Sequence, residues 1–136
     1  MRYLGVDVAK DSLEVADTTG TRGRSFPNTA AGIDTMLSWF SRSFPNSGQH
    51  LIVEPTSTYH HPLVCALAAQ GLPYTLINPA RTAAFAKVQG KRAKTDRVDA
   101  RVLASLGESQ QPEPSPPPEE DQEGLKALRR HLGWLE

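Results

Sequence analysis

Two acidic residues of this sequence stand where acidic side chains are uncommon. Asp7 lies inside a short apolar run near the start of the chain, and Glu54 ends a second one. A carboxylate withdrawn from water costs several kcal/mol unless it forms an ion pair or binds a metal ion. Each acid therefore needs a partner, which is either a base such as Arg2 or Lys10 or a bound cation.

A second pair of acids, Asp96 and Asp99, is spaced three residues apart on a helix that we expect to begin near Thr95. This spacing places both carboxylates on one face of the helix. Two negative charges so close together favour a bound cation, but the N-terminal dipole of a helix capped by Thr95 also accommodates acids. Both interpretations stay open at the level of the sequence.

Together the four acids Asp7, Glu54, Asp96 and Asp99 form a ligand set made only of oxygen atoms. Such a set suits Mg²⁺ or Mn²⁺ better than zinc or copper. Two such ions about 4 Å apart can stabilise the attacking and the leaving oxygen of a phosphoryl displacement. If the four side chains meet, the chemistry they support is the cutting of a phosphodiester backbone.

The formal net charge of zero conceals a basic segment between two acidic ones. Residues 81–107 carry seven Lys or Arg against two Asp, whereas residues 108–136 carry three bases against seven acids. A local excess of this kind is typical of phosphate-backbone binding, and equally of an exposed basic helix without a ligand. The phosphate contacts that we predict are Arg81, Lys91, Arg92, Lys94 and Arg97.

The apolar spacing predicts an α/β domain with the element order βββαβαβα. The expected strands are 3–8, 13–17, 21–26, 50–54 and 73–77, and the expected helices follow Thr29, follow Ser57 or Thr58 as far as Gln70, and follow Asn78. Three hairpin strands followed by alternating units favour a mixed sheet with helices on both faces. This is the layout of the RNase H-like, or RuvC-like, fold.

Sugar kinases and actin-like ATPases open with a similar strand and aspartate. Those proteins need glycines directly after the aspartate so that phosphate can approach the backbone, whereas Val8-Ala9-Lys10 follows here. The turn without glycine therefore argues against an ATPase.

The folded domain is expected to span residues 1–107. Residues 108–118 are rich in proline and predict a semi-rigid linker. Residues 119–136 carry leucines at alternating intervals of three and four, which predicts the start of a helical or coiled-coil connector. Because the chain stops inside this pattern, we expect it to be a truncated piece of a longer protein.

The 136 residues are enough for one compact domain with a core. No apolar run approaches the length of a membrane span, and the N-terminus carries Asp7 where a signal peptide would be apolar. We therefore expect a cytoplasmic protein with no membrane partner.

Four short stretches of the sequence resemble those of one known family, the DEDD-type insertion-sequence transposases related to the Piv/MooV invertases. Their N-terminal domain is RuvC-like. The similar stretches are Gly5-Val6-Asp7-Val8-Ala9-Lys10, Val53-Glu54-Pro55-Thr56-Ser57 with Tyr59, Ile77-Asn78-Pro79 with Arg81, and Lys94-Thr95-Asp96-Arg97-Val98-Asp99-Ala100. Their order and spacing make the resemblance specific.

The resemblance implies a Mg²⁺-dependent domain (Mn²⁺ could replace Mg²⁺) that cuts and rejoins DNA during transposition. Asp7, Glu54, Asp96 and Asp99 match the four acidic positions of the family. It further implies a guide RNA as a partner, a homo-oligomer (dimer or tetramer) of the full-length protein, and a C-terminal serine domain that these residues lack. The alternatives are a RuvC-type junction-resolving nuclease and a non-catalytic nucleic-acid-binding module.

Overall fold

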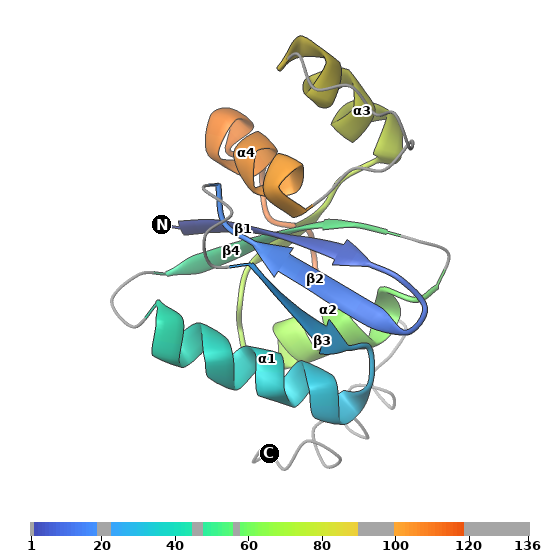
Figure 1. Ribbon diagram of the computed structural model, residues 1–136, viewed down its shortest axis with the longest axis vertical. Helices are drawn as coiled ribbons and strands as arrows, with labels where there is room; N and C mark the ends of the chain where they lie inside the picture. The colour runs from blue at the N-terminus through green and yellow to red at the C-terminus, as the bar shows by residue number, and fades with distance from the viewer. Residues whose placement is uncertain (1, 19–22, 45–47, 56–57, 90–99, 119–136) are drawn as a thin grey trace.

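The computed structural model describes residues 2–18, 23–44, 48–55, 58–89 and 100–118. The elements within these residues are β1 (Arg2–Val8), β2 (Ser12–Ala16), β3 (Arg24–Pro27), α1 (Ala30–Ser43), β4 (Gln49–Glu54), α2 (His61–Ala69), β5 (Tyr74–Leu76), α3 (Pro79–Val88) and α4 (Ala100–Gln110). The predicted order βββαβαβα is confirmed, and α4 follows it (Figure 1).

The strands form a mixed sheet in the order β3-β2-β1-β4-β5. The first three strands pair antiparallel as a meander, and β4 and β5 add on parallel to β1. The two central strands, β1 and β4, come from distant parts of the sequence and run side by side. This arrangement is the predicted RNase H-like sheet.

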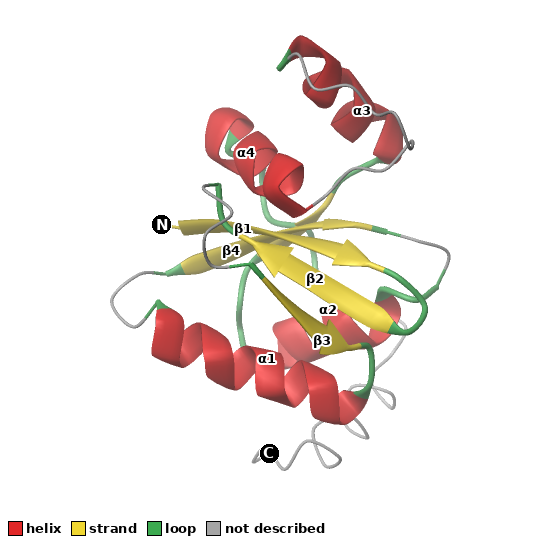
Figure 2. Ribbon diagram, viewed as in Figure 1, coloured by secondary structure: helices red, strands yellow, loops and turns green. Residues whose placement is uncertain are grey.

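The two faces of the sheet are covered by different helices. Helices α1 and α2 lie against one face and α3 and α4 lie on the other (Figure 2). Because strand side chains alternate between faces, Leu4, Val6 and Val8 enter the larger core beneath α1 and α2. Tyr3 and Asp7 belong to the opposite face, with α3 and α4.

Helix α1 follows its predicted cap. The Thr29 hydroxyl accepts a hydrogen bond from the Gly32 amide at 3.0 Å, and Ile33, Met36 and Phe40 are buried on one side. None of the helices in the described part of the chain is both long and apolar enough to cross a bilayer.

Helix α2 begins later than expected, so the prediction of a Ser57 or Thr58 cap is wrong. Its first residue is His61, and the capping position falls on His60, whose side chain makes no capping hydrogen bond. Proline is favoured in the first turn of a helix, and Pro62 occupies it here. The start of α2 is therefore set by the proline rather than by a hydroxyl.

Two glycines let α4 approach the sheet closely. A Cβ atom on Gly5 would overlap the Ala100 carbonyl oxygen and would lie 2.7 Å from the Leu103 Cβ. A Cβ atom on Gly107 would lie 2.6 Å from the Ile52 side chain. The first turn of α4 thus rests beside the middle of β1, where only a residue without a side chain fits.

The direction of α4 follows from the same contacts. Its start, Ala100, lies beside Gly5, and near its end the position of Gly107 lies against Tyr3. Helix α4 therefore runs opposite to β1, with its N-terminus toward the carboxyl end of that strand.

The predicted boundary between domain and linker needs correction. Helix α4 continues to Gln110, so residues 108–110 belong to the folded domain. The helix ends at Gln110, Gln111 then has a φ of 46°, and Pro112 follows. Residues 108–110 contain no proline and are compatible with a helix. The prediction assigned them to the linker because of the prolines that follow them. Residues 119–136 lie outside the described part of the chain.

Part of the proline-rich segment is docked along β5. The Ser115 amide donates to the Tyr74 carbonyl at 2.7 Å, and the Leu76 amide donates to the Ser115 hydroxyl at 3.0 Å. The Thr75 hydroxyl donates to the Glu113 carbonyl at 2.8 Å. The segment therefore covers the edge of the sheet.

Gly5→Ala should destabilise the domain by about 1–3 kcal/mol because the new methyl group must displace α4 from β1. We expect a lower urea midpoint and faster hydrogen exchange of the amides of α4.

Gly71→Ala is the matched control, since Gly71 has a φ of 72° and open space around it. It should lower stability through backbone strain without a selective effect on α4. Unchanged exchange of α4 in Gly5→Ala would contradict the close approach of helix and strand.

Candidate active site

Asp7 and Glu54 are direct neighbours in the sheet. They are paired in the parallel register of β1 and β4, and both lie at the carboxyl ends of their strands. Paired residues share a face, and this is the face that α3 and α4 cover. Both side chains are half-buried. Two of the four acids that the sequence singles out therefore lie side by side, although 47 positions separate them in the chain.

The electrostatics of Glu54 reflect this neighbour. Burial raises the pKa of the Glu54 carboxyl above its usual value, and the charge of Asp7 raises it further. A hydrogen bond from the Thr82 side chain acts in the opposite direction and lowers the pKa. The net result is that the charged form of Glu54 is less favoured over the protonated form than it would be in water, as expected for a partly buried acid beside a second acid.

Thr82 is fully buried on α3. Its hydroxyl has a single hydrogen, and the Asn78 carbonyl lies 3.4 Å away, which is long for such a bond. We therefore assign the hydrogen to the Glu54 carboxylate. The amino-acid sequence does not single out this residue, because a threonine near the start of a helix carries no signal of its own.

The connection between β5 and α3 positions Thr82. The Ile77 amide donates to the Val53 carbonyl at 2.9 Å, which extends the sheet contact by one residue. The Asn78 side chain then accepts from the Ala80 amide at 2.7 Å, and Pro79 opens the helix. Cap and proline therefore start α3 at a point where its first turn faces the end of β4.

Asp96 and Asp99 lie outside the described residues, so their position relative to Asp7 stays a prediction. Among the residues that are described, no group of three or more His, Cys, Asp or Glu side chains is placed to hold a metal ion. The described part of the predicted set is the pair of Asp7 and Glu54.

The predicted phosphate-binding residues divide in the same way. Arg81 is exposed on α3, and its Nε and Nη2 atoms donate to the Gln110 Oε1 atom at 2.8 and 2.6 Å. This contact ties α3 to the end of α4. The other four residues, Lys91, Arg92, Lys94 and Arg97, lie in the part of the chain that is not described.

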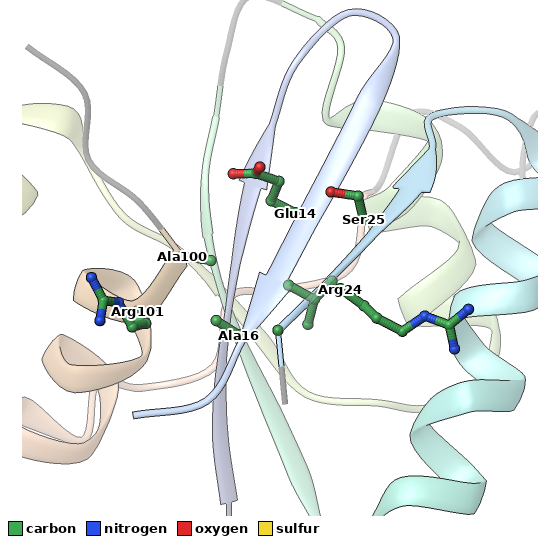
Figure 3. A pocket seen from close by; sticks show the side chains of 8 residues that line it. Glu14, Ala16, Arg24, Ser25, Ala100 and Arg101 are labelled. Carbon is green, nitrogen blue, oxygen red and sulfur yellow. The ribbon is translucent and has the colours of Figure 1, made fainter. Parts of the chain in front are cut away.

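A pocket of about 390 Å³ opens between the β2–β3 hairpin and the start of α4 (Figure 3). Glu14, Ser25, Ala100 and Arg101 are among its lining residues. Glu14 pairs with Asp7 across β1 and β2, and Ser25 pairs with Glu14 across β2 and β3. Asp7, Glu14 and Ser25 are therefore cross-strand neighbours, and Glu14 and Ser25 line this pocket.

The amino-acid sequence does not single out Glu14 as a site residue. The alternation of residues 12–16 separates it from the buried Leu13 and Val15, but that pattern is typical of an ordinary solvent-facing acid. Its pairing with Asp7 depends on the register of the hairpin, which the amino-acid types do not reveal.

This fold and this pair of acids define an RNase H-like domain with carboxylates at the ends of its central parallel strands. The chain belongs to the DEDD transposase family, whose model, described as "Transposase", matches residues 4–133.

Two relatives show how much of a longer protein this chain represents. It is 31% identical over 130 residues to the pilin gene-inverting protein of Moraxella bovis, an alignment that covers 93% of this chain and 40% of the relative. It is 30% identical over 129 residues to the protein of the same name from Moraxella lacunata, with the same coverage. The chain therefore spans about 40% of the length of these relatives.

Glu54→Gln should make the metal-free domain more stable at pH 7. The raised pKa of Glu54 means that the folded state binds its proton more tightly than the unfolded state does, so stability falls as the pH rises through the folded pKa. Glutamine removes this penalty. We expect thermal unfolding in EDTA to show a midpoint a few degrees higher, with the difference shrinking as the pH falls through the raised pKa of the folded state and vanishing below the ordinary value of 4.5.

The control for this measurement is Glu108→Gln, because Glu108 is exposed on α4. Glu108→Gln should leave the midpoint of thermal unfolding nearly unchanged both at pH 7 and below pH 4.5. A Glu54→Gln variant less stable than the wild type at pH 7 would show that the carboxylate stabilises the fold instead.

Proposed function

We propose that this chain is the metal-binding N-terminal domain of a DNA transposase or recombinase, which cuts and rejoins DNA. The observation that supports this most directly is the pairing of Asp7 with Glu54 in a chain of the transposase family. The name of the two Moraxella relatives, which refers to inversion of a gene, points to a rearrangement of the same kind.

The proposed cofactor is Mg²⁺ or Mn²⁺, held by Asp7 and Glu54 together with Asp96 and Asp99. Oxygen ligands suit these ions, and a cation would offset the burial and the charge of Asp7 that raise the Glu54 pKa. When bound, the metal would stabilise the charge on the oxygens of the phosphodiester that is being cut.

The geometry of α4 supports a place for Asp99 in this set. Asp99 is bonded to Ala100, and neighbouring Cα atoms lie about 3.8 Å apart. Ala100 lies beside Gly5, and Asp7 follows Gly5 by two strand positions, or about 7 Å. The N-terminus of α4, at Ala100, faces the carboxyl end of β1, which supports the proposal that Asp99 joins Asp7 at the metal.

The residues of this chain have distinct tasks in the proposed reaction. Thr82 holds the Glu54 carboxylate in one orientation, which prepares it to bind a cation without a further loss of freedom. The basic residues Lys91, Arg92, Lys94 and Arg97, with Arg81, are proposed to contact the phosphates of the nucleic acid.

The full-length protein is proposed to bind DNA and a guide RNA and to assemble as a dimer or tetramer. A C-terminal serine domain would supply the group that attacks the phosphodiester. This chain matches only 40% of its relatives, so we propose that by itself it carries out little or no strand exchange.

Mn²⁺ should raise the midpoint of thermal unfolding, because a ligand that binds only the folded state stabilises it, by about 2.7 kcal/mol at one hundred times its Kd. Asp7→Ala and Asp99→Ala should each abolish the shift, whereas Glu108→Ala should keep it. The measurement is a thermal titration against MnCl₂ after EDTA treatment. No shift in the wild type would favour a non-catalytic nucleic-acid-binding module.

A recombination assay with this chain as the only protein should give no detectable product. The expected reason is the missing nucleophile, and the control is the same assay with a full-length family member. Robust recombination by the chain alone would contradict the requirement for a second domain, and cleavage of branched junctions alone would favour a RuvC-type nuclease.

A further inference from the structure

One side chain joins the two segments that leave the acid-bearing strands. Asn28, between β3 and α1, donates from its Nδ2 atom to the Ala9 carbonyl at 2.9 Å and to the Tyr59 carbonyl at 3.0 Å. Ala9 follows Asp7 by two residues, and Tyr59 follows Glu54 by five. Both hydrogens of one amide group are therefore used to hold together the segments that follow β1 and β4.

The backbone cannot provide this connection itself. The parallel ladder of β1 and β4 ends with the pair Asp7 and Glu54. The next residue of the second strand is Pro55, which has no N–H group to continue the ladder. Beyond the two acids, the Asn28 side chain takes the place of the missing backbone hydrogen bonds.

Asn28 is itself held firmly. The backbone N–H of Asn28 donates to the Asp11 carbonyl at 3.0 Å, which ties Asn28 to the turn between β1 and β2. The next residue, Thr29, caps α1, a helix of 14 residues whose apolar side lies in the larger core. Asn28 is therefore anchored, through the start of α1, to the larger core of the domain.

The Asn28 Oδ1 atom shows that the two donor contacts of this amide determine its orientation. This oxygen is buried, and it has no hydrogen-bond partner in the described part of the chain. A buried acceptor without a partner is unfavourable. The two carbonyl groups require donors, so the amide keeps this orientation despite that cost.

From these contacts we infer that Asn28 is a positioning residue, which sets the spacing of Asp7 and Glu54 for a bound cation by clamping the segments that follow them. This inference rests on the proposed function. Residues that orient metal ligands without touching the metal typically contribute about 10- to 100-fold to metal affinity. We expect the contribution of Asn28 to be about tenfold or more.

The test compares three variants of this chain by titration with Mn²⁺, followed by electron paramagnetic resonance of the free ion. Asn28→Asp removes both donors while keeping the size of the side chain, and Asn28→Ala removes the whole amide. Both should weaken Mn²⁺ binding about tenfold or more. Asn28→Gln keeps the donors on a longer side chain and should recover part of the affinity.

Gln49→Ala is the matched control. The Gln49 side-chain amide also donates to a backbone carbonyl, that of Phe44, at 3.0 Å, but it lies at the opposite end of β4. This variant should lose stability in EDTA to a similar extent while keeping the wild-type affinity for Mn²⁺. A purely structural role for Asn28 would make the two positions behave alike.

The outcomes separate this inference from the proposed function. Tight binding by the wild type and weak binding by Asn28→Asp, with Gln49→Ala unaffected, supports the clamp. Equal affinity in the wild type, Asn28→Asp and Asn28→Ala overturns the clamp and leaves the metal site intact. A wild type that binds no Mn²⁺ overturns both.

A second measurement guards against misfolding of the variants. Hydrogen exchange of metal-free Asn28→Ala should be faster around Ala9 and Tyr59, whereas the amides of α1 keep their protection. Unchanged exchange around these two residues would overturn the clamp whatever the metal titration shows.

Discussion

The register of β1 and β4 is the constraint on which the candidate site depends. It pairs Asp7 with Glu54, and burial together with this neighbour raises the pKa of Glu54. A shift of one residue along either strand would move one acid to the opposite face and into the apolar core. The unfavourable closeness of two carboxylates is therefore built into the pairing that forms the centre of the fold.

The two faces of the sheet divide the work of stability and function. The face beneath α1 and α2 holds the larger apolar core, in which Leu4, Leu51 and Phe40 are almost fully buried. The opposite face has a smaller cluster, to which α3 and α4 contribute Phe85, Val102, Leu103 and Leu106. A well-filled core on one side allows the other side to carry polar groups that do not stabilise the domain.

The amino-acid sequence predicts the parts of this arrangement that rest on local patterns. The apolar surroundings of Asp7 and Glu54, the alternation of the strands and the spacing in α1 were sufficient for the fold and for the choice of these two acids. Pairing between distant segments has no such local pattern. Glu14 looks like a surface acid, Thr82 like any helical threonine, and Asn28 like a residue that merely precedes a helix. Their roles depend on register and on the approach of other elements, which are tertiary properties.

The proline-rich segment shows how the same composition can have a different structural meaning. The sequence suggests a linker because proline cannot join a ladder on both sides, yet residues 113–116 lie along β5. Between Pro112 and Pro118 only Glu113 and Ser115 keep an N–H group, and that of Ser115 is bonded to β5. A strand-like segment with few outward donors cannot easily pair with another chain, which is one way to protect a sheet edge. The prolines therefore belong to a segment that covers the edge strand of the sheet.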